Sequence, residues 1–165
     1  MAQVGSIVAS KAAGMLRIDS GLAFSVADIA QKAGMEAASI SAGQIVAENV
    51  AFEMVERSTG AKYPAWHVYC ERVVNEMREK FRTFSGKAYL AIEVRVSQDR
   101  LDGLERQLQL CVDAATQVLD SNRGDWGNGM FYTGGYEIQF GPAKHGGKNF
   151  LKAAKVIFAV DVSIH

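Results

Sequence analysis

A strictly alternating stretch near the middle of the chain restricts the fold more than any other feature. Apolar side chains occupy every second position there, at Leu90, Ile92, Val94 and Val96. The positions between them carry Ala91, Glu93, Arg95 and Ser97. A period of two is typical of a β-strand with one buried face. The chain must therefore build a sheet whose apolar face is covered by another element.

The segment that follows has the pattern of a covering helix. Asp99 is a suitable N-cap residue for a helix over residues 100–120. Spacings of three and four place its apolar side chains on one stripe, typical of a helix that packs on a sheet. That stripe consists of Leu101, Leu104, Leu108, Cys111, Val112, Ala115, Val118 and Leu119.

Three further segments alternate in the same way: residues 65–71, 136–140 and 155–164. With the central strand and the helix they give the order β-β-α-β-β after Pro64. The simplest architecture is an α+β fold in which one helix packs on one face of a four-stranded, largely antiparallel sheet.

The segment before Pro64 has weaker patterns. We expect a helix over residues 2–16 and a second short helix that starts at Ser25 and ends before Gly34. Residues 35–50 fit neither period. We therefore divide the chain into an N-terminal helical and irregular segment, residues 1–60, and an α+β domain, residues 61–165.

The charge of the chain is balanced overall but not locally. The 165 residues include 18 Lys and Arg against 18 Asp and Glu, so the net charge is zero. This balance excludes a protein that binds nucleic acid through its total charge. Residues 1–60 carry an excess of acidic side chains, and the remainder carries the balancing basic excess. The two halves can therefore attract each other, within one chain or between neighbouring copies.

Cysteine content and hydropathy indicate the compartment. Cys70 and Cys111 are too few for a disulfide scaffold, and we interpret them as buried free thiols in a reducing compartment. No window approaches the ~20 apolar residues of a membrane span. The N-terminus lacks the basic region of a signal peptide. We expect a protein that is made in the cytoplasm and does not contact a membrane.

Catalytic and cofactor motifs are not recognisable. His67, His145 and His165 are far apart in sequence, and no cysteine or acid pair has the spacing of metal ligands. The glycine-rich segment 141–149 fails as a phosphate-binding loop because it has Pro142 where glycine is needed and Asn149 where serine or threonine is needed. We therefore expect no catalytic, cofactor-binding or metal-binding residues, and a protein that is not an enzyme.

One segment suggests DNA binding. Residues 25–41 resemble the helix-turn-helix of bacterial repressors similar to the lactose repressor, with an Ala-Gly turn at Ala33 and Gly34. A recognition helix needs basic side chains to meet phosphates. Residues 35–56 contain no lysine or arginine and four acidic residues. A helix-turn-helix regulator is therefore the less favoured alternative.

The second half of the chain resembles the tail terminator proteins of long-tailed bacteriophages. The similarity covers residues 60–165, about two thirds of the chain, and lies in the order and pattern of elements. It rests on the amphipathic helix and on five short blocks: Tyr63-Pro64-Ala65-Trp66-His67-Val68-Tyr69, Arg82-Thr83-Phe84-Ser85-Gly86, Glu93-Val94-Arg95-Val96-Ser97, Gly135-Tyr136-Glu137-Ile138 and Ala154-Lys155-Val156-Ile157-Phe158.

This resemblance implies a structural virion protein located in the tail or neck of the particle and made in the host bacterial cytoplasm. Members of the family form a homohexameric ring that ends the tail tube and joins it to the head connector. The implied partners are other copies of the chain, the tail tube protein and the connector or stopper protein. A head–tail joining or tail-completion protein of the same virion class is the nearest alternative.

Two basic segments are candidate contact regions. The arm from Arg72 to Lys87 can reach a neighbouring subunit, since arginine and aromatic residues are frequent at interface hot spots. Its candidate interface residues are Arg72, Arg78, Phe81, Arg82 and Phe84. The hairpin from residue 141 to 155 carries lysines and no acid, and it can line a channel for passing DNA. The candidate channel residues are Lys144, Lys148 and Lys152.

Overall fold

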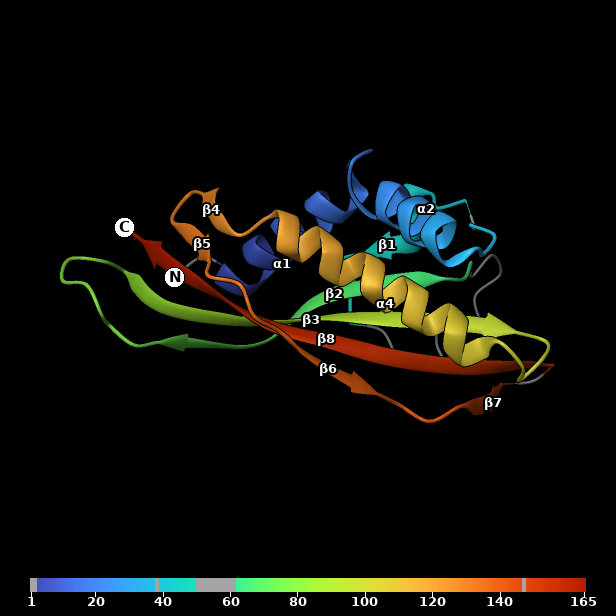
Figure 1. Ribbon diagram of the computed structural model, residues 1–165. Helices are drawn as coiled ribbons and strands as arrows, with labels where there is room; N and C mark the ends of the chain where they lie inside the picture. The colour runs from blue at the N-terminus through green and yellow to red at the C-terminus, as the bar shows by residue number, and fades with distance from the viewer. Residues whose placement is uncertain (1–2, 38, 50–61, 147) are drawn as a thin grey trace.

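The computed structural model describes residues 3–37, 39–49, 62–146 and 148–165. Helices cover one face of a long mixed sheet (Figure 1). The helices are α1 (Val4–Arg17), α2 (Leu22–Ala33), the short 3₁₀ helix η1 (Ala42–Gln44) and α4 (Leu104–Ser121). The strands are β1 (Ile45–Val46), β2 (Ala65–Asn75), β3 (Phe84–Gln98), β4 (Gly124–Gly127), β5 (Met130–Tyr132), β6 (Glu137–Phe140), β7 (Lys144–Gly146) and β8 (Asn149–Ile164).

Two long antiparallel strands, β3 and β8, form the centre of the sheet. They pair without interruption from Phe84 opposite Ile164 to Gln98 opposite Phe150. On one side the order continues through β2 to β1, and on the other side β5, β6 and β7 pair with successive parts of β8. β1 runs parallel to β2, which makes the sheet mixed.

The predicted four-stranded, largely antiparallel sheet is wrong, because the described residues form an eight-stranded mixed sheet. Four short strands were missed. β4 and β5 are joined by a tight turn in which Asn128 and Gly129 have positive φ angles of 54° and 80°. Asn-Gly is the preferred sequence for this hairpin turn. β1 has two residues, and β7 lies in the stretch expected to be a loop; both are too short to show a period of two.

Two helix starts also differ from expectation. α4 begins at Leu104, after Gly103 with φ 79°, so Asp99 is not its N-cap. α2 begins at Leu22, and Ser25 is a buried residue inside the helix instead of its cap. In both cases glycine precedes the helix and no side chain caps it.

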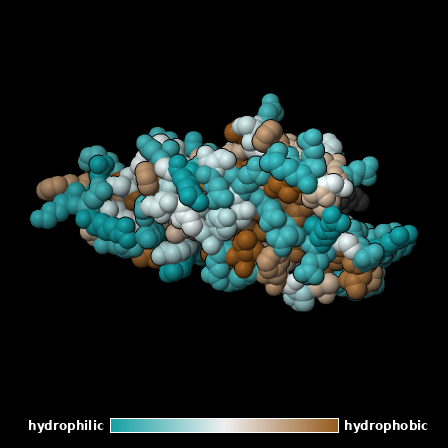
Figure 2. Space-filling view, in the orientation of Figure 1, coloured by the Kyte–Doolittle hydropathy of each residue, from teal (hydrophilic) through white to brown (hydrophobic). Residues whose placement is uncertain are grey.

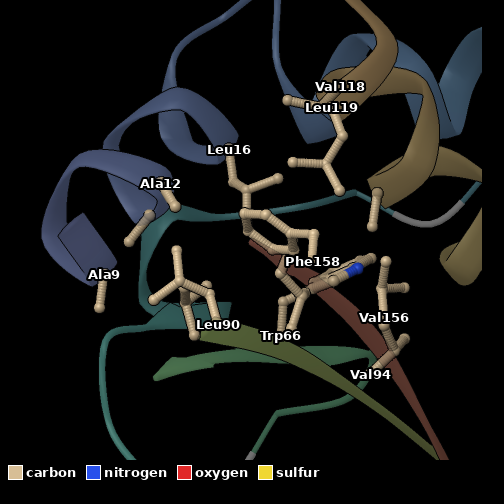
Figure 3. Close-up of a cluster of buried hydrophobic side chains, with 14 of the residues drawn as sticks. Ala9, Ala12, Leu16, Trp66, Leu90, Val94, Val118, Leu119, Val156 and Phe158 are labelled. Carbon is tan, nitrogen blue, oxygen red and sulfur yellow. The ribbon is translucent and has the colours of Figure 1, made fainter. Parts of the chain in front are cut away.

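A single hydrophobic core joins helices from both halves of the chain to the sheet. Figure 3 shows Leu16 of α1 and Leu119 of α4 directed toward Trp66 and Phe158 of the sheet. Trp66 is fully buried, and its indole Nε1 donates a hydrogen bond to the Cys111 carbonyl of α4, 3.3 Å away. The expected domain boundary at residue 60 lies outside the described residues, as do two acids of the N-terminal excess, Glu53 and Glu56.

The segment after α2 does not have the arrangement of a helix-turn-helix. Gly34 ends α2 in the left-handed conformation. Among the described residues 35–37 and 39–49, the only helical element is η1, which is followed by β1. The part of the chain that the structure describes here therefore contains no helix long enough to enter a major groove.

Candidate functional site

The candidate site is the arm, residues 72–87, which is a β-hairpin formed by the ends of β2 and β3. Pairing extends from Arg72 opposite Tyr89 to Asn75 opposite Gly86, and residues 76–83 form the arm tip. The arm projects beyond the rest of the molecule (Figure 1). The arm expected from the sequence therefore has regular strands at its base, β2 as far as Asn75 and β3 from Phe84.

Asn75 organises the arm tip. Its side-chain oxygen accepts hydrogen bonds from the backbone N–H groups of Met77 and Ser85, at 3.2 and 3.1 Å. Its side-chain nitrogen donates to the Thr83 carbonyl, 3.3 Å away. One side chain therefore ties both sides of the tip together, which favours a defined tip conformation.

The two phenylalanines of the arm lie in opposite surroundings. Phe81, in the arm tip, is 91% exposed, with a left-handed backbone (φ 65°). Phe84 is 0% exposed and belongs to the hydrophobic core. Of this predicted pair, only Phe81 offers its side chain to another molecule.

Met77 is an exposed apolar residue of the arm that the sequence reasoning missed. It lies in the arm tip, is 61% exposed, and also has a left-handed backbone (φ 51°). A bulky residue rarely adopts a positive φ, and such positions concentrate at functional sites. Methionine has no preference for this conformation, so the sequence did not indicate it. The tip therefore displays two large apolar side chains, and Figure 2 shows apolar and polar side chains side by side at this end.

The three predicted arginines of the arm have partners within the same chain. The guanidinium of Arg72 lies over the Tyr89 ring, 3.8 Å from its centroid. Arg78 pairs with Glu76 and, at 3.7 Å, with Asp161 of β8. Arg82 pairs with Glu79 at 3.3 Å. These contacts hold the arm in its extended position and leave the apolar tip residues as its most exposed feature.

The predicted channel lysines differ in exposure, although Lys144 and Lys152 line one surface pocket. Lys144 is exposed on β7, opposite Leu151 of β8, and Lys148 is exposed in the turn that follows. The side chain of Lys152 is 14% exposed and pairs with Glu105 of α4 at 3.5 Å. Lys144 and Lys148 are therefore available to an anion, whereas Lys152 is already neutralised by the helix.

A buried polar cluster lies on β2 and β3, and consists of His67, Glu93 and Arg95. Arg95 is 2% exposed and pairs with Glu93 through two nitrogens, one of them 2.9 Å from the carboxylate oxygen. Its Nη1 lies 3.5 Å from Nε2 of His67, which must accept because a guanidinium only donates. Burial and the neighbouring Arg95 lower the pKa of His67. His67 is 4% exposed and neutral in this arrangement.

The cysteines and acidic residues show no reactive arrangement among the described residues. Cys70 and Cys111 are free thiols, and burial raises the pKa of Cys111 to about 12. Cys70 is half-buried, more accessible than expected. In the described residues no three His, Cys, Asp or Glu side chains are grouped to hold a metal ion.

The described helices are all too short or too polar to cross a membrane. Comparisons with known proteins give no further constraint: no protein-family model matches the chain, and no curated protein matches it.

Proposed function

We propose that this chain is a structural virion protein that forms a homohexameric ring, ends a phage tail tube and joins it to the head connector. The observation that carries this proposal is the projecting arm with Phe81 91% exposed at its tip. A large apolar side chain held away from its own fold is characteristic of a protein–protein contact.

The form of the arm favours contact between copies of the chain. A closed ring of identical subunits uses a heterologous interface, in which one surface of a subunit meets a different surface of the next. A projection on one side of the subunit suits this geometry, because it reaches the neighbour without requiring a two-fold axis. The order of two strands, a helix and further strands also agrees with the resemblance to tail terminators.

The exposed lysines extend the proposal to DNA. Lys144 and Lys148 have exposed side chains on the β7 turn. In a ring with this turn toward its channel, they contact phosphates without reading sequence. Lys152 is left out of this role because Glu105 neutralises it.

The deciding experiment measures mass in solution by light scattering and images the same sample by negative stain. We expect rings with six-fold symmetry, formed either by the purified chain or on addition of the tail tube protein. Rings of another symmetry would favour a head–tail joining protein. A monomer that persists at high concentration with tube protein present overturns the proposal, as does a dimer that retains one specific DNA duplex in moderate salt.

A further inference from the structure

A groove of about 460 Å³ lies between α1 and the outer edge of β2. One wall is the first half of α1, where small residues line the groove: Gly5, Ser6, Ala9 and Ser10. The opposite wall is β2 from Val68 to Val73, and residues 47–49 close one end. At Gly5 the helix packs directly against β2, since an added Cβ would lie only 3.0 Å from Cβ of Cys70, so this glycine sets the close approach of α1 to the strand.

Within the described residues, the outer edge of β2 is unpaired along the part that forms the groove wall. On this side β2 pairs with β1 only at Trp66 and His67. From Val68 onward, no strand in the described part of the chain pairs with this edge. An edge of this kind presents backbone N–H and C=O groups and neighbouring side chains to another molecule.

We propose that this groove receives the arm tip, residues 76–83, of a neighbouring copy of the chain. The inference rests on the proposed ring and identifies the surface that the arm meets. Phe81 and Met77 supply the apolar side chains, and Val73, 36% exposed in the groove wall, supplies an apolar surface for them.

Charge complements the apolar contact. Glu48 is an exposed acid that lines the groove; Glu71 also lines it but already pairs with Lys155, 3.7 Å away. Lys80 is exposed in the arm tip, and it has no ion pair with the described residues. Its ammonium is therefore the tip cation best placed to meet Glu48, because Arg78 and Arg82 pair within the arm.

The occupant must come from a second molecule. The groove wall at residues 68–73 lies at the base of the arm of the same chain, whose strands stay paired as far as Asn75 and Gly86. A paired hairpin cannot fold back along its own strand edge. The arm tip of one copy can therefore enter only the groove of another copy, which gives a heterologous contact.

Cysteine cross-linking tests the contact directly. Both double variants carry Cys70→Ser, because the native thiol of Cys70 also lines the groove. The test variant Lys80→Cys, Ser6→Cys then places one thiol on the arm tip and one on the groove wall. The matched control, Lys80→Cys with Lys11→Cys, uses an exposed position on the same helix that does not line the groove. Under mild oxidation we expect the first variant to give a ladder of linked species up to the hexamer, and the control to remain mainly unlinked.

The outcomes separate this inference from the proposed function. Rings that form without linkage above the control overturn the groove as the receiving site and leave the ring proposal standing. Failure to form rings or linked species, with the tail tube protein present, overturns both. A second variant, Ser10→Trp, fills the groove from an exposed position, and we expect it to raise the concentration needed for assembly about tenfold or more, whereas Lys11→Trp has no effect. An equal effect of both tryptophans would also overturn the groove.

Discussion

Phe81 and Phe84 differ completely in solvent exposure: the side chain of Phe81 is 91% exposed in the arm tip, and that of Phe84 is 0% exposed in the core. Phe84 faces the interior where β3 begins to pair with β8, opposite Ile164. The arm therefore combines an anchored base with an exposed tip. Substitutions at these two residues separate assembly from stability.

We expect Phe81→Ala to abolish ring formation while changing the free energy of unfolding by less than about 0.5 kcal/mol, because an exposed side chain contributes little to folding. Phe84→Ala is expected to cost about 3–5 kcal/mol, because it leaves a cavity in the core. Light scattering measures the first effect and urea denaturation the second. Assembly of Phe81→Ala at the wild-type concentration would contradict the role of the arm.

Gly129, in the turn that precedes β5, lies directly against Ser163 of β8. Its φ is 80°, and an added Cβ would lie 2.0 Å from the Ser163 carbonyl oxygen. Gly129→Ala must therefore displace the backbone, and it weakens the hydrogen bond from the Ser163 N–H to the Gly129 carbonyl, now 2.8 Å long. We expect a loss of more than about 1 kcal/mol in thermal or urea denaturation.

Gly127 provides the matched control for that substitution. Its φ is similar, 82°, but an added Cβ there meets no atom within 4 Å. Gly127→Ala therefore measures the effect of backbone strain alone, and it should lower the free energy of unfolding by less than Gly129→Ala does. Equal losses would show that the clash with Ser163 is relieved without cost.

His67 should make the stability of the fold depend on pH. Burial and Arg95 lower its pKa in the folded state, whereas in the unfolded chain it has its ordinary value of about 6.5. As the pH falls below that value, the unfolded chain binds a proton that the folded chain does not, so the free energy of unfolding decreases. The contribution is present above pH ~6.5 and is lost progressively in more acidic solution.

The variant His67→Gln should flatten this dependence between about pH 7.5 and pH 5, roughly the range in which an unperturbed histidine titrates. His145→Gln, at an exposed position on β7, serves as the control and should leave the slope unchanged. Urea denaturation at several pH values measures both. An unchanged slope in His67→Gln would assign the dependence to other groups.

The lysines of the β7 turn should govern DNA binding by the assembled ring. We expect Lys144→Gln and Lys148→Gln each to remove one phosphate interaction per subunit that faces the DNA. Each interaction removed lowers the slope of log affinity against log salt by about one. Lys152→Gln should leave the slope unchanged because Glu105 already pairs with this lysine. Filter binding of random duplex DNA over a series of salt concentrations distinguishes the three variants.

The sequence predicted the strands and helices that are long enough to show a clear hydrophobic pattern. The core of β3 follows from the alternation of Leu90, Ile92, Val94 and Val96, and most of α4 follows from its apolar stripe. β1 was not predicted, because two residues cannot show alternation and its partner Trp66 is distant in sequence. The Asn-Gly sequence at Asn128 and Gly129 was sufficient to predict the turn, but the turn was not predicted.

The role of the candidate interface residues stays a prediction. The structure places Phe81 exposed at the tip of a hairpin formed by β2 and β3. The burial of Phe84 was not foreseen, since it depends on β3 beginning at Phe84, ahead of the alternating stretch that starts at Leu90. The left-handed conformation of Met77 depends on the hydrogen bond to Asn75, a local interaction that composition does not reveal.

The position of β8 in the sheet bears on when the ring can assemble during synthesis. β8 pairs with β3, β5, β6 and β7, all of which precede it in the chain. Until β8 leaves the ribosome, β3 lacks one neighbour and the three short strands lack their only long one. The pairing of β3 with β8 joins segments far apart in sequence, and we expect it to form late in folding. In the proposed ring, an arm whose base is not yet fixed by β8 would have no defined direction in which to reach a neighbour, so assembly would have to wait for β8.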